Sequence, residues 1–212
     1  HDAVVSAKSR SIPHAIVIRK DTFGKYKLRQ EALNDYPLSR EEALMQVVDH
    51  LGDNDIVVST TGKLSRELFE YRESKGQGHA RDFLTVGHSS SIALGVALEK
   101  PDRRVYCLDG DGAFIMHMGA VSNIGDLSPK NYRHVLFNNG AHESVGGQPT
   151  LGFRLDIASI AKGCGYAHVL TASDKEGLSC ALEKLSGLSG PVLLEIKVRI
   201  DSRDDLGRPT TT

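Results

Sequence analysis

The chemistry-bearing motif that stands out in the chain is Gly110-Asp111-Gly112-Ala113. It follows an apolar run, residues 105–108, and precedes a segment with helical spacing, residues 113–124. Glycines at such a junction let the backbone approach a phosphate, and the free N–H groups of the following helix favour its negative charge. Asp111 would place a carboxylate beside that phosphate, which makes chemical sense when a divalent cation bridges the two. The motif predicts a site for a phosphate and a cation.

A second set of ligands is expected at a neighbouring strand end. The motif is neither G-x-G-x-x-G nor G-x-x-x-x-G-K-[ST], so a dinucleotide or a P-loop nucleotide is not expected. Asn138-Asn139 follows the apolar run 135–137, and the interval between the two motifs holds one helix and one strand. Both motifs therefore fall on the same edge of a sheet. An Asn amide oxygen and a nearby main-chain carbonyl are ligands that Mg²⁺ takes beside one carboxylate.

The elements that must position these motifs are short apolar runs alternating with helical patterns. This alternation predicts a three-layer α/β/α fold with a mostly parallel six-stranded sheet, whose ligands bind outside the carboxyl ends of the strands. A further apolar run, residues 15–18, is expected to form a strand before this body, and capping boxes at Ser39 and Ser173 are expected to open helices. The predicted strands are 56–58, 83–86, 105–108, 135–137, 167–170 and 192–198, and the predicted helices are 40–51, 63–73, 91–98, 113–124, 156–162 and 173–188.

Length and composition exclude several classes of protein. The 212 residues, 40% hydrophobic and 25% charged, suffice for one α/β domain with a full core. A net charge of -1 lacks the footprint of a nucleic-acid binder, and no apolar stretch approaches the length of a membrane span, so neither is an expected partner. Cys107, Cys164 and Cys180 lie far apart and are expected to be buried small side chains in a reducing cytosol, which predicts a cytoplasmic protein.

The two motifs together resemble a known family. Gly110-Asp111-Gly112 and, 25 residues later, Asn138-Asn139 are similar to the GDG…NN thiamine-diphosphate motif of the decarboxylase and acetolactate-synthase superfamily. Residues 138–150, NNGAHESVGGQPT, resemble more narrowly the phosphonopyruvate decarboxylase family, as do residues 60–68 and 205–211. The resemblance covers nearly the whole chain from residue 39 and implies a thiamine-diphosphate-binding fold. Sulfopyruvate decarboxylases share the cofactor site, so a sulfopyruvate decarboxylase beta-type subunit stays open as an alternative.

The resemblance implies roles for particular residues. Thiamine diphosphate and Mg²⁺ are the implied cofactors, with Asp111, the side chain of Asn139 and the main-chain oxygen of Ala141 as the metal ligands. Backbone N–H groups of Gly112 and Ala113 would bind the diphosphate. Thr61 and Gly62 are further candidates, although a helix start without ligand explains them nearly as well. The implied cofactor-binding set is Thr61, Gly62, Gly87, Gly110, Asp111, Gly112, Ala113 and Asn139.

Two departures from the family's pattern bear on activity. Val86-Gly87 runs straight into His88, where the family usually carries a Gly-Ser-Met-Gly turn, so about three residues are either deleted or belong to a loop outside the chain. The family's pyrimidine-binding domain, whose glutamate activates the cofactor, is represented by its last strand alone. The expected division is therefore the end of a pyrimidine-binding domain and linker in 1–38, a diphosphate-binding domain in 39–200 and a tail in 201–212.

The implied reaction is decarboxylation of 3-phosphonopyruvate to phosphonoacetaldehyde and CO2 in phosphonate biosynthesis. The catalytic glutamate is expected outside the chain, so this portion alone is expected to be inactive. A pyrimidine-binding domain of the same or a second chain is the expected partner, and a homo-oligomer is expected from the family. A non-catalytic module that completes a partner's active site is the alternative from another functional class.

Basic residues near the expected mouth of the site are candidates for the phosphonate. They are Lys63, Arg81, His88 and His142, each weighed evenly against an ordinary surface role. His142 directly follows the metal-binding loop and is also a possible catalytic residue. Glu143 is expected to accept N–H groups of its own loop. Met116, Met118, Leu108 and Phe137 are expected in the core, and ordinary structural positions are expected for His79, His117, His134 and His168.

Overall fold

The main sheet of the protein has six strands that all pair in parallel. The computed structural model describes residues 2–19, 22–24, 34–85, 87–203, 205–207 and 209. In these residues the strand order is β2-β1-β3-β4-β8-β7, and every register is parallel. The predicted six-stranded sheet is confirmed. Its strands are β1 (Ile56–Thr60), β2 (Asp82–Thr85), β3 (Val105–Gly110), β4 (Tyr132–Asn138), β7 (His168–Ala172) and β8 (Val192–Lys197).

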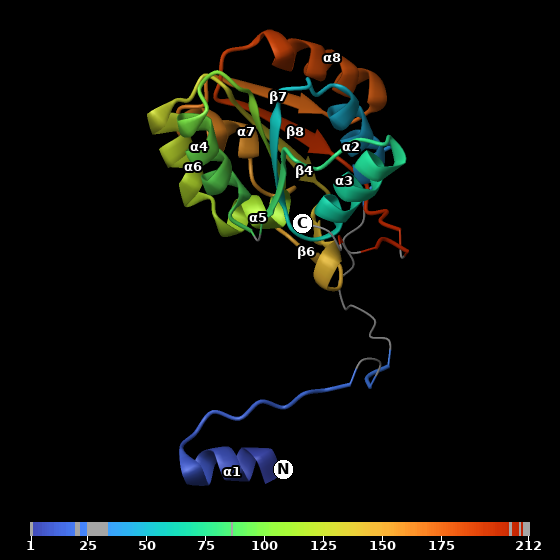
Figure 1. Cartoon of the computed structure of the whole chain (residues 1–212), viewed down its shortest axis with the longest axis vertical. Coiled ribbons are helices and arrows are strands. Elements are labelled where there is room, and N and C mark those ends of the chain that lie inside the picture. The colour runs from blue at the N-terminus through green and yellow to red at the C-terminus, as the bar shows by residue number, and fades with distance from the viewer. Residues whose placement is uncertain are drawn as a thin grey trace.

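Helices cover both faces of the sheet, which confirms the three-layer α/β/α prediction (Figure 1). Side chains that alternate along β3 point into two separate cores: Tyr106 and Leu108 into one, Val105 and Cys107 into the other. Burial on both faces explains why the strands read as nearly continuous apolar runs. The first core is covered by α2 (Arg40–Asp49), α3 (Lys63–Ser74) and α8 (Lys175–Gly187), and the second by α4 (Ser89–Glu99), α5 (Asp111–Met116), α6 (Gly119–Leu127) and α7 (Ile157–Gly163).

The N-terminal segment differs from its prediction. Residues 12–19 form no strand, and α1 (Asp2–Arg10), which precedes them, has no buried residue. Figure 1 shows α1 standing apart from the sheet. Val17 is 92% exposed, so the apolar run has no layer against which to pack. A lone extended segment forms no sheet hydrogen bonds, and for this reason the strand expected at 15–18 is absent.

One predicted helix is two helices in the structure. The segment 113–124 is divided into α5, which already begins at Asp111, and α6, with a turn at His117 and Met118 between them. This turn carries Met116 and Met118 to the surface, where they are 66% and 38% exposed. The expectation that both methionines lie in the core is therefore wrong. Leu108 and Phe137 are buried as predicted.

The helix starts show which capping predictions hold. The Ser39 box is present: the Glu42 N–H donates to Ser39 Oγ at 3.1 Å, and the Ser39 N–H donates to Glu42 Oε2 at 3.0 Å. The second of these bonds, in which the Ser39 N–H donates to the Glu42 carboxylate, lowers the pKa of Glu42 to about 2. At α8 the cap is Asp174 instead of Ser173, because the Asp174 carboxylate accepts the Gly177 N–H at 2.8 Å. The capping box expected at Ser173 is wrong by one residue.

The loop after β4 folds back over the sheet edge as a small hairpin. Its elements are β5 (Ala141–His142), a short 3₁₀ helix η1 (Glu143–Val145) and β6 (Gln148–Pro149), with β5 and β6 antiparallel. The Thr150 N–H donates to the Gly140 carbonyl at 2.8 Å and closes the base of the hairpin. This ordered return brings residues 150–152 back beside the carboxyl ends of β3 and β4.

Cysteine positions and helix lengths test two remaining expectations. Cys107 is buried as expected, but Cys164 is only half-buried and Cys180 is exposed on α8, so the expectation of three buried cysteines is wrong.

No helix in the described part of the chain is both long and apolar enough to cross a membrane. Val86, expected at the end of a strand, and Arg208, Thr210 and Thr211, which belong to the resemblance at 205–211, lie outside the described residues.

Candidate functional site

A cavity of about 280 Å³ opens at the carboxyl ends of β1, β3 and β4. Neighbouring parallel strands end together here, so the segments that follow them meet at one edge, as the sequence predicts. The predicted residues that line the cavity are Thr61, Lys63, Gly87, His88, Gly110, Asp111, Gly112, Ala113, Asn139, Ala141 and His142. Gly62 lies directly behind its wall, where an added Cβ would be 3.4 Å from Ser144 Cβ.

Two glycines of the predicted set lie where an added side chain would be strained or would displace a neighbour. Gly62 has φ of +113° at the start of α3, a conformation that side chains with a Cβ rarely adopt. At Gly112 an added Cβ would lie 2.6 Å from the ring of His142. Of the two, Gly112 lines the cavity, where its small size leaves backbone N–H groups open to a phosphate.

Asp111 is a buried carboxylate that shares the cavity with the imidazole of His142. It is 3% exposed, and burial raises its pKa, although the Thr150 hydroxyl donates to Oδ2. Within the described residues no Lys or Arg forms an ion pair with it. Burying a carboxylate costs free energy unless a positive charge compensates it. The site therefore fits a cation bound at Asp111.

The two asparagines after β4 have different surroundings. Asn138 is fully buried: its amide nitrogen donates to the Gly152 carbonyl at 2.9 Å and to Glu195 at 2.8 Å, and its oxygen accepts the Gly140 N–H at 3.2 Å. It stabilises the loop. Asn139 instead lines the cavity, and its Oδ1 accepts one N–H, from Ala141 at 3.0 Å.

The oxygen atoms offered at this edge are of the kind that Mg²⁺ prefers. Asp111 supplies a carboxylate, Asn139 an amide oxygen and Ala141 a main-chain carbonyl, and all three residues line the one cavity. No thiolate takes part in this donor set. The residues present therefore fit the magnesium and diphosphate site that the resemblance implies.

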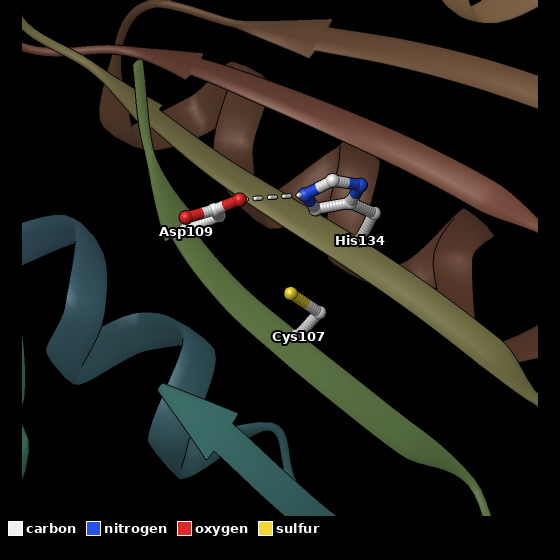
Figure 2. A group of neighbouring side chains, drawn as sticks. All are labelled: Cys107, Asp109 and His134. Carbon is white, nitrogen blue, oxygen red and sulfur yellow. Dashed lines mark hydrogen bonds and ion pairs between the residues drawn. The ribbon is translucent and has the colours of Figure 1, made fainter. Parts of the chain in front are cut away.

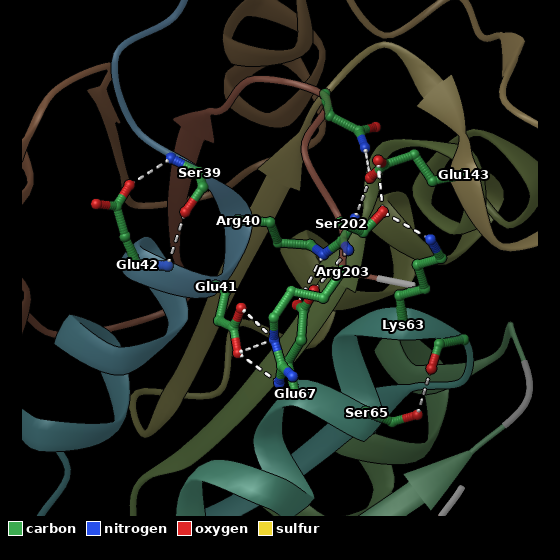
Figure 3. A network of polar contacts seen from close by, with 12 residues as sticks. Ser39, Arg40, Glu41, Glu42, Lys63, Ser65, Glu67, Glu143, Ser202 and Arg203 are labelled. Atoms are coloured by element: carbon green, nitrogen blue, oxygen red, sulfur yellow. Dashed lines mark hydrogen bonds and ion pairs between the residues drawn. The ribbon is translucent and has the colours of Figure 1, made fainter. Parts of the chain in front are cut away.

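A buried ion-pair network that the sequence did not predict forms one wall (Figure 3). Arg40 donates from Nε and Nη2 to Glu67 at 2.9 and 2.7 Å, and from Nη1 to Glu143 at 2.5 Å. Burial alone would lower the pKa of Arg40, but the two carboxylates outweigh it and raise that pKa. Burial raises the pKa of Glu67. Glu143 thus accepts from Arg40 and, within its own loop, from the side-chain N–H of Asn139. No main-chain N–H of that loop is among its donors in the described residues.

The candidate substrate-binding residues are only partly brought together. Lys63, His88 and His142 line the cavity, but Arg81 precedes β2 at the opposite, amino end of the sheet, so its assignment to the mouth is wrong. His117, expected at an ordinary position, packs against His88 with ring centroids 3.7 Å apart. The sequence placed these two histidines 29 residues apart, and only the fold joins them.

A second cluster, Cys107, Asp109 and His134, lies in the core below the Gly110–Ala113 turn (Figure 2). Asp109 accepts from Ser89 Oγ and from the Gly110 N–H, each at 3.1 Å, and lies 3.4 Å from His134 Nε2. The other His134 nitrogen is 2.9 Å from the Tyr166 hydroxyl. Because these groups already satisfy one another, the cluster is a structural network under the turn, consistent with the structural position expected for His134.

Comparisons with known proteins agree with this geometry. The chain is 38% identical to a phosphonopyruvate decarboxylase of Streptomyces viridochromogenes over 174 residues, which are 82% of this chain and 43% of that protein. It is 37% identical to sulfopyruvate decarboxylase subunit beta of Methanocaldococcus jannaschii over 66% of this chain and 73% of that subunit.

A solved structure has the same fold. A thiamine diphosphate-dependent 4-hydroxybenzoylformate decarboxylase of Rhodococcus jostii superposes with a TM-score of 0.63 at 18% identity, over 87% of this chain and 37% of that chain. The family described as "Thiamine pyrophosphate enzyme, C-terminal TPP binding domain" matches residues 60–196 and includes both strand-end motifs. The chain belongs to this family of thiamine pyrophosphate-binding domains, as the resemblance of its motifs implied.

Proposed function

We propose that this chain is the diphosphate-binding portion of a Mg²⁺- and thiamine-diphosphate-dependent decarboxylase that converts 3-phosphonopyruvate to phosphonoacetaldehyde and CO2 in phosphonate biosynthesis. The observation that carries the proposal is the buried Asp111, which forms no ion pair with a Lys or Arg of the described residues, in a cavity lined by the family's two motifs. The 38% identity to a phosphonopyruvate decarboxylase supports the choice of substrate. The chain spans less than half of that relative's length, which supports the proposal that a further part completes the enzyme.

The residues of this chain would bind and orient the cofactor. When bound, thiamine diphosphate supplies the electron sink that lets a 2-oxo acid lose CO2. Asp111, Asn139 and Ala141 would hold Mg²⁺, while backbone N–H groups of Gly112 and Ala113 would bind the diphosphate. Lys63, His88 and His142 would offer positive charge or N–H donors to the phosphonate.

The proposed domain division places the activating glutamate elsewhere. Residues 1–38 would be the end of a pyrimidine-binding domain and its linker, 39–200 the diphosphate-binding domain and 201–212 a tail. A pyrimidine-binding domain, in the same or a second chain, would supply the glutamate. The relative named as a beta subunit supports the idea of a separate partner chain.

A sulfopyruvate decarboxylase beta-type subunit is the second candidate. The chain covers 73% of the Methanocaldococcus jannaschii beta subunit at 37% identity. Phosphonate and sulfonate differ in charge, so competition between the two acids in the completed enzyme separates the candidates. A preference for sulfopyruvate would replace the first proposal by the second.

Calorimetric titration of thiamine diphosphate with Mg²⁺ tests the cofactor assignment. The chain is titrated alone and with a pyrimidine-binding half supplied by a relative, and Asp111→Ala is the control. Binding that requires Mg²⁺ and Asp111, and that strengthens with the added half, is the expected result. Absence of Mg²⁺-dependent binding in both samples would overturn the proposal.

A further inference from the structure

The carboxylate of Glu143 joins the expected metal ligand Asn139 to the buried ion pairs of the cavity wall. We propose that Glu143 is a positioning residue: it fixes the amide of Asn139 so that Oδ1, and not Nδ2, faces the cation. This inference rests on the proposed function, because it concerns the same cation site.

The contacts of Glu143 are short and well shielded from water. Its Oε2 accepts from Asn139 Nδ2 at 2.6 Å and from Arg40 Nη1 at 2.5 Å, and its Oε1 accepts from Ser202 Oγ at 2.6 Å. The side chain of Glu143 is 8% exposed, and Asn139 is 4% exposed. Shielded hydrogen bonds to an ionised carboxylate are roughly twice as strong as those between neutral groups.

The chemistry of the pair allows one orientation of the amide. An ionised carboxylate can only accept hydrogen bonds, so Glu143 can face only the NH₂ end of Asn139. Asn139 Oδ1 then points away from Glu143 and receives one N–H, from Ala141, at 3.0 Å. An amide oxygen has two lone pairs, so one stays available to a cation.

Glu143 is itself held by parts of the chain far away in sequence. Arg40, which donates to it, also donates twice to Glu67, so the wall contains one guanidinium between two carboxylates. Ser202, which donates to Oε1, accepts from Lys63 Nζ at 2.8 Å. The orientation of Asn139 is thereby tied to α2, α3 and the C-terminal segment. Ligands held in this way before the metal arrives bind it more tightly.

The first experiment measures Mn²⁺ binding to the full chain in the presence of saturating thiamine diphosphate. Water-proton relaxation detects bound Mn²⁺, which accepts the same oxygen ligands as Mg²⁺. Glu143→Ala, which removes the acceptor, is expected to weaken Mn²⁺ binding by about 10- to 100-fold, the usual effect of losing a group that orients a metal ligand. Glu183→Ala is the matched control, because it makes the same change at an exposed position of α8 outside the cavity; its Mn²⁺ affinity is expected to stay near that of the parent chain.

Glu143→Gln tests the role of the acceptor itself. The Gln amide oxygen can take the place of Oε2, which accepts from both Asn139 Nδ2 and Arg40 Nη1, while its NH₂ group faces Ser202 Oγ. Glu143→Gln is therefore expected to keep most of the Mn²⁺ affinity. Glu143→Leu, which also offers no acceptor, replaces Glu143→Ala if that chain does not fold.

The possible results separate the two proposals. Unchanged Mn²⁺ affinity in Glu143→Ala, or a loss in Glu143→Gln as large as the loss in Glu143→Ala, would overturn the positioning role and leave the cofactor assignment intact. If the parent chain binds no Mn²⁺ with thiamine diphosphate at millimolar concentrations, the proposed function fails and the inference fails with it.

Discussion

Gly152 matters at the residue scale because the chain passes close to Asp111 there. A Cβ added at this position would lie 2.6 Å from Asp111 Oδ2 and would also collide with Asn138 Oδ1. Real side chains do not approach so closely, and backbone at a turn yields less easily than the tip of a flexible side chain. The absence of a side chain at residue 152 therefore sets the position of the Asp111 carboxylate.

Gly152→Ala is accordingly expected to weaken Mg²⁺-dependent binding of thiamine diphosphate by about tenfold or more, as loss of support for a metal ligand does. Calorimetric titration measures this change. Gly95→Ala is the matched control, since no atom lies within 4 Å of an added Cβ there, and helix propensity favours Ala by about 0.5–1 kcal/mol. Equal affinities in the two variants would show that the Asp111 carboxylate tolerates displacement.

At the scale of a single element, the cap at the start of α2 is expected to stabilise the fold. Ser39 and Glu42 satisfy two backbone N–H groups that a helix N-terminus otherwise leaves without partners. Ser39→Ala is expected to lower the free energy of unfolding by about 1 kcal/mol. Urea denaturation measures this free energy. The control is Ser179→Ala, which changes an exposed residue of α8. No difference between the two variants would contradict a stabilising role for the cap.

The same cap makes stability depend on pH. The pKa of Glu42 is about 2 in the folded protein against 4.5 as its ordinary value, so folding favours the ionised form. Its stabilising contribution is complete above 4.5 and is lost as pH falls toward about 2. The difference in unfolding free energy between the parent chain and Glu42→Gln is expected to shrink over that range. A difference that stays constant or grows as the pH falls would refute this assignment.

At the scale of the whole molecule, we propose that the cavity is one side of a larger site. The chain corresponds to 43% of the Streptomyces viridochromogenes relative, and the proposed activating glutamate belongs to the remainder. We expect no measurable CO2 release from phosphonopyruvate by this chain with Mg²⁺ and thiamine diphosphate. Addition of a pyrimidine-binding half is expected to start turnover, unless that half carries a Glu→Gln change at its activating residue. Decarboxylation by the chain alone would contradict this division of roles.

The sequence by itself determined the layers of the fold and the edge at which the site lies. Apolar runs, helical spacing and the Ser39 cap act over a few residues, so each can be recognised locally. The Gly110-Asp111-Gly112 and Asn138-Asn139 motifs follow adjacent parallel strands, and strand direction alone brings them together. Dependence on local pattern also explains the wrong prediction at residues 15–18. The pattern there is typical of a strand, but the segment has no layer to pack against.

Only the tertiary structure decided which side chains meet inside the cavity. Glu143 contacts Arg40 across 103 residues, Thr150 contacts Asp111 across 39, and His88 packs on His117. Such pairs depend on which strands are neighbours and on how the hairpin after β4 returns. Neither the strand order nor the path of the hairpin can be predicted from spacing in the sequence. Hydrogen bonds between side chains require distances near 3 Å, which long-range packing sets once every element is in place.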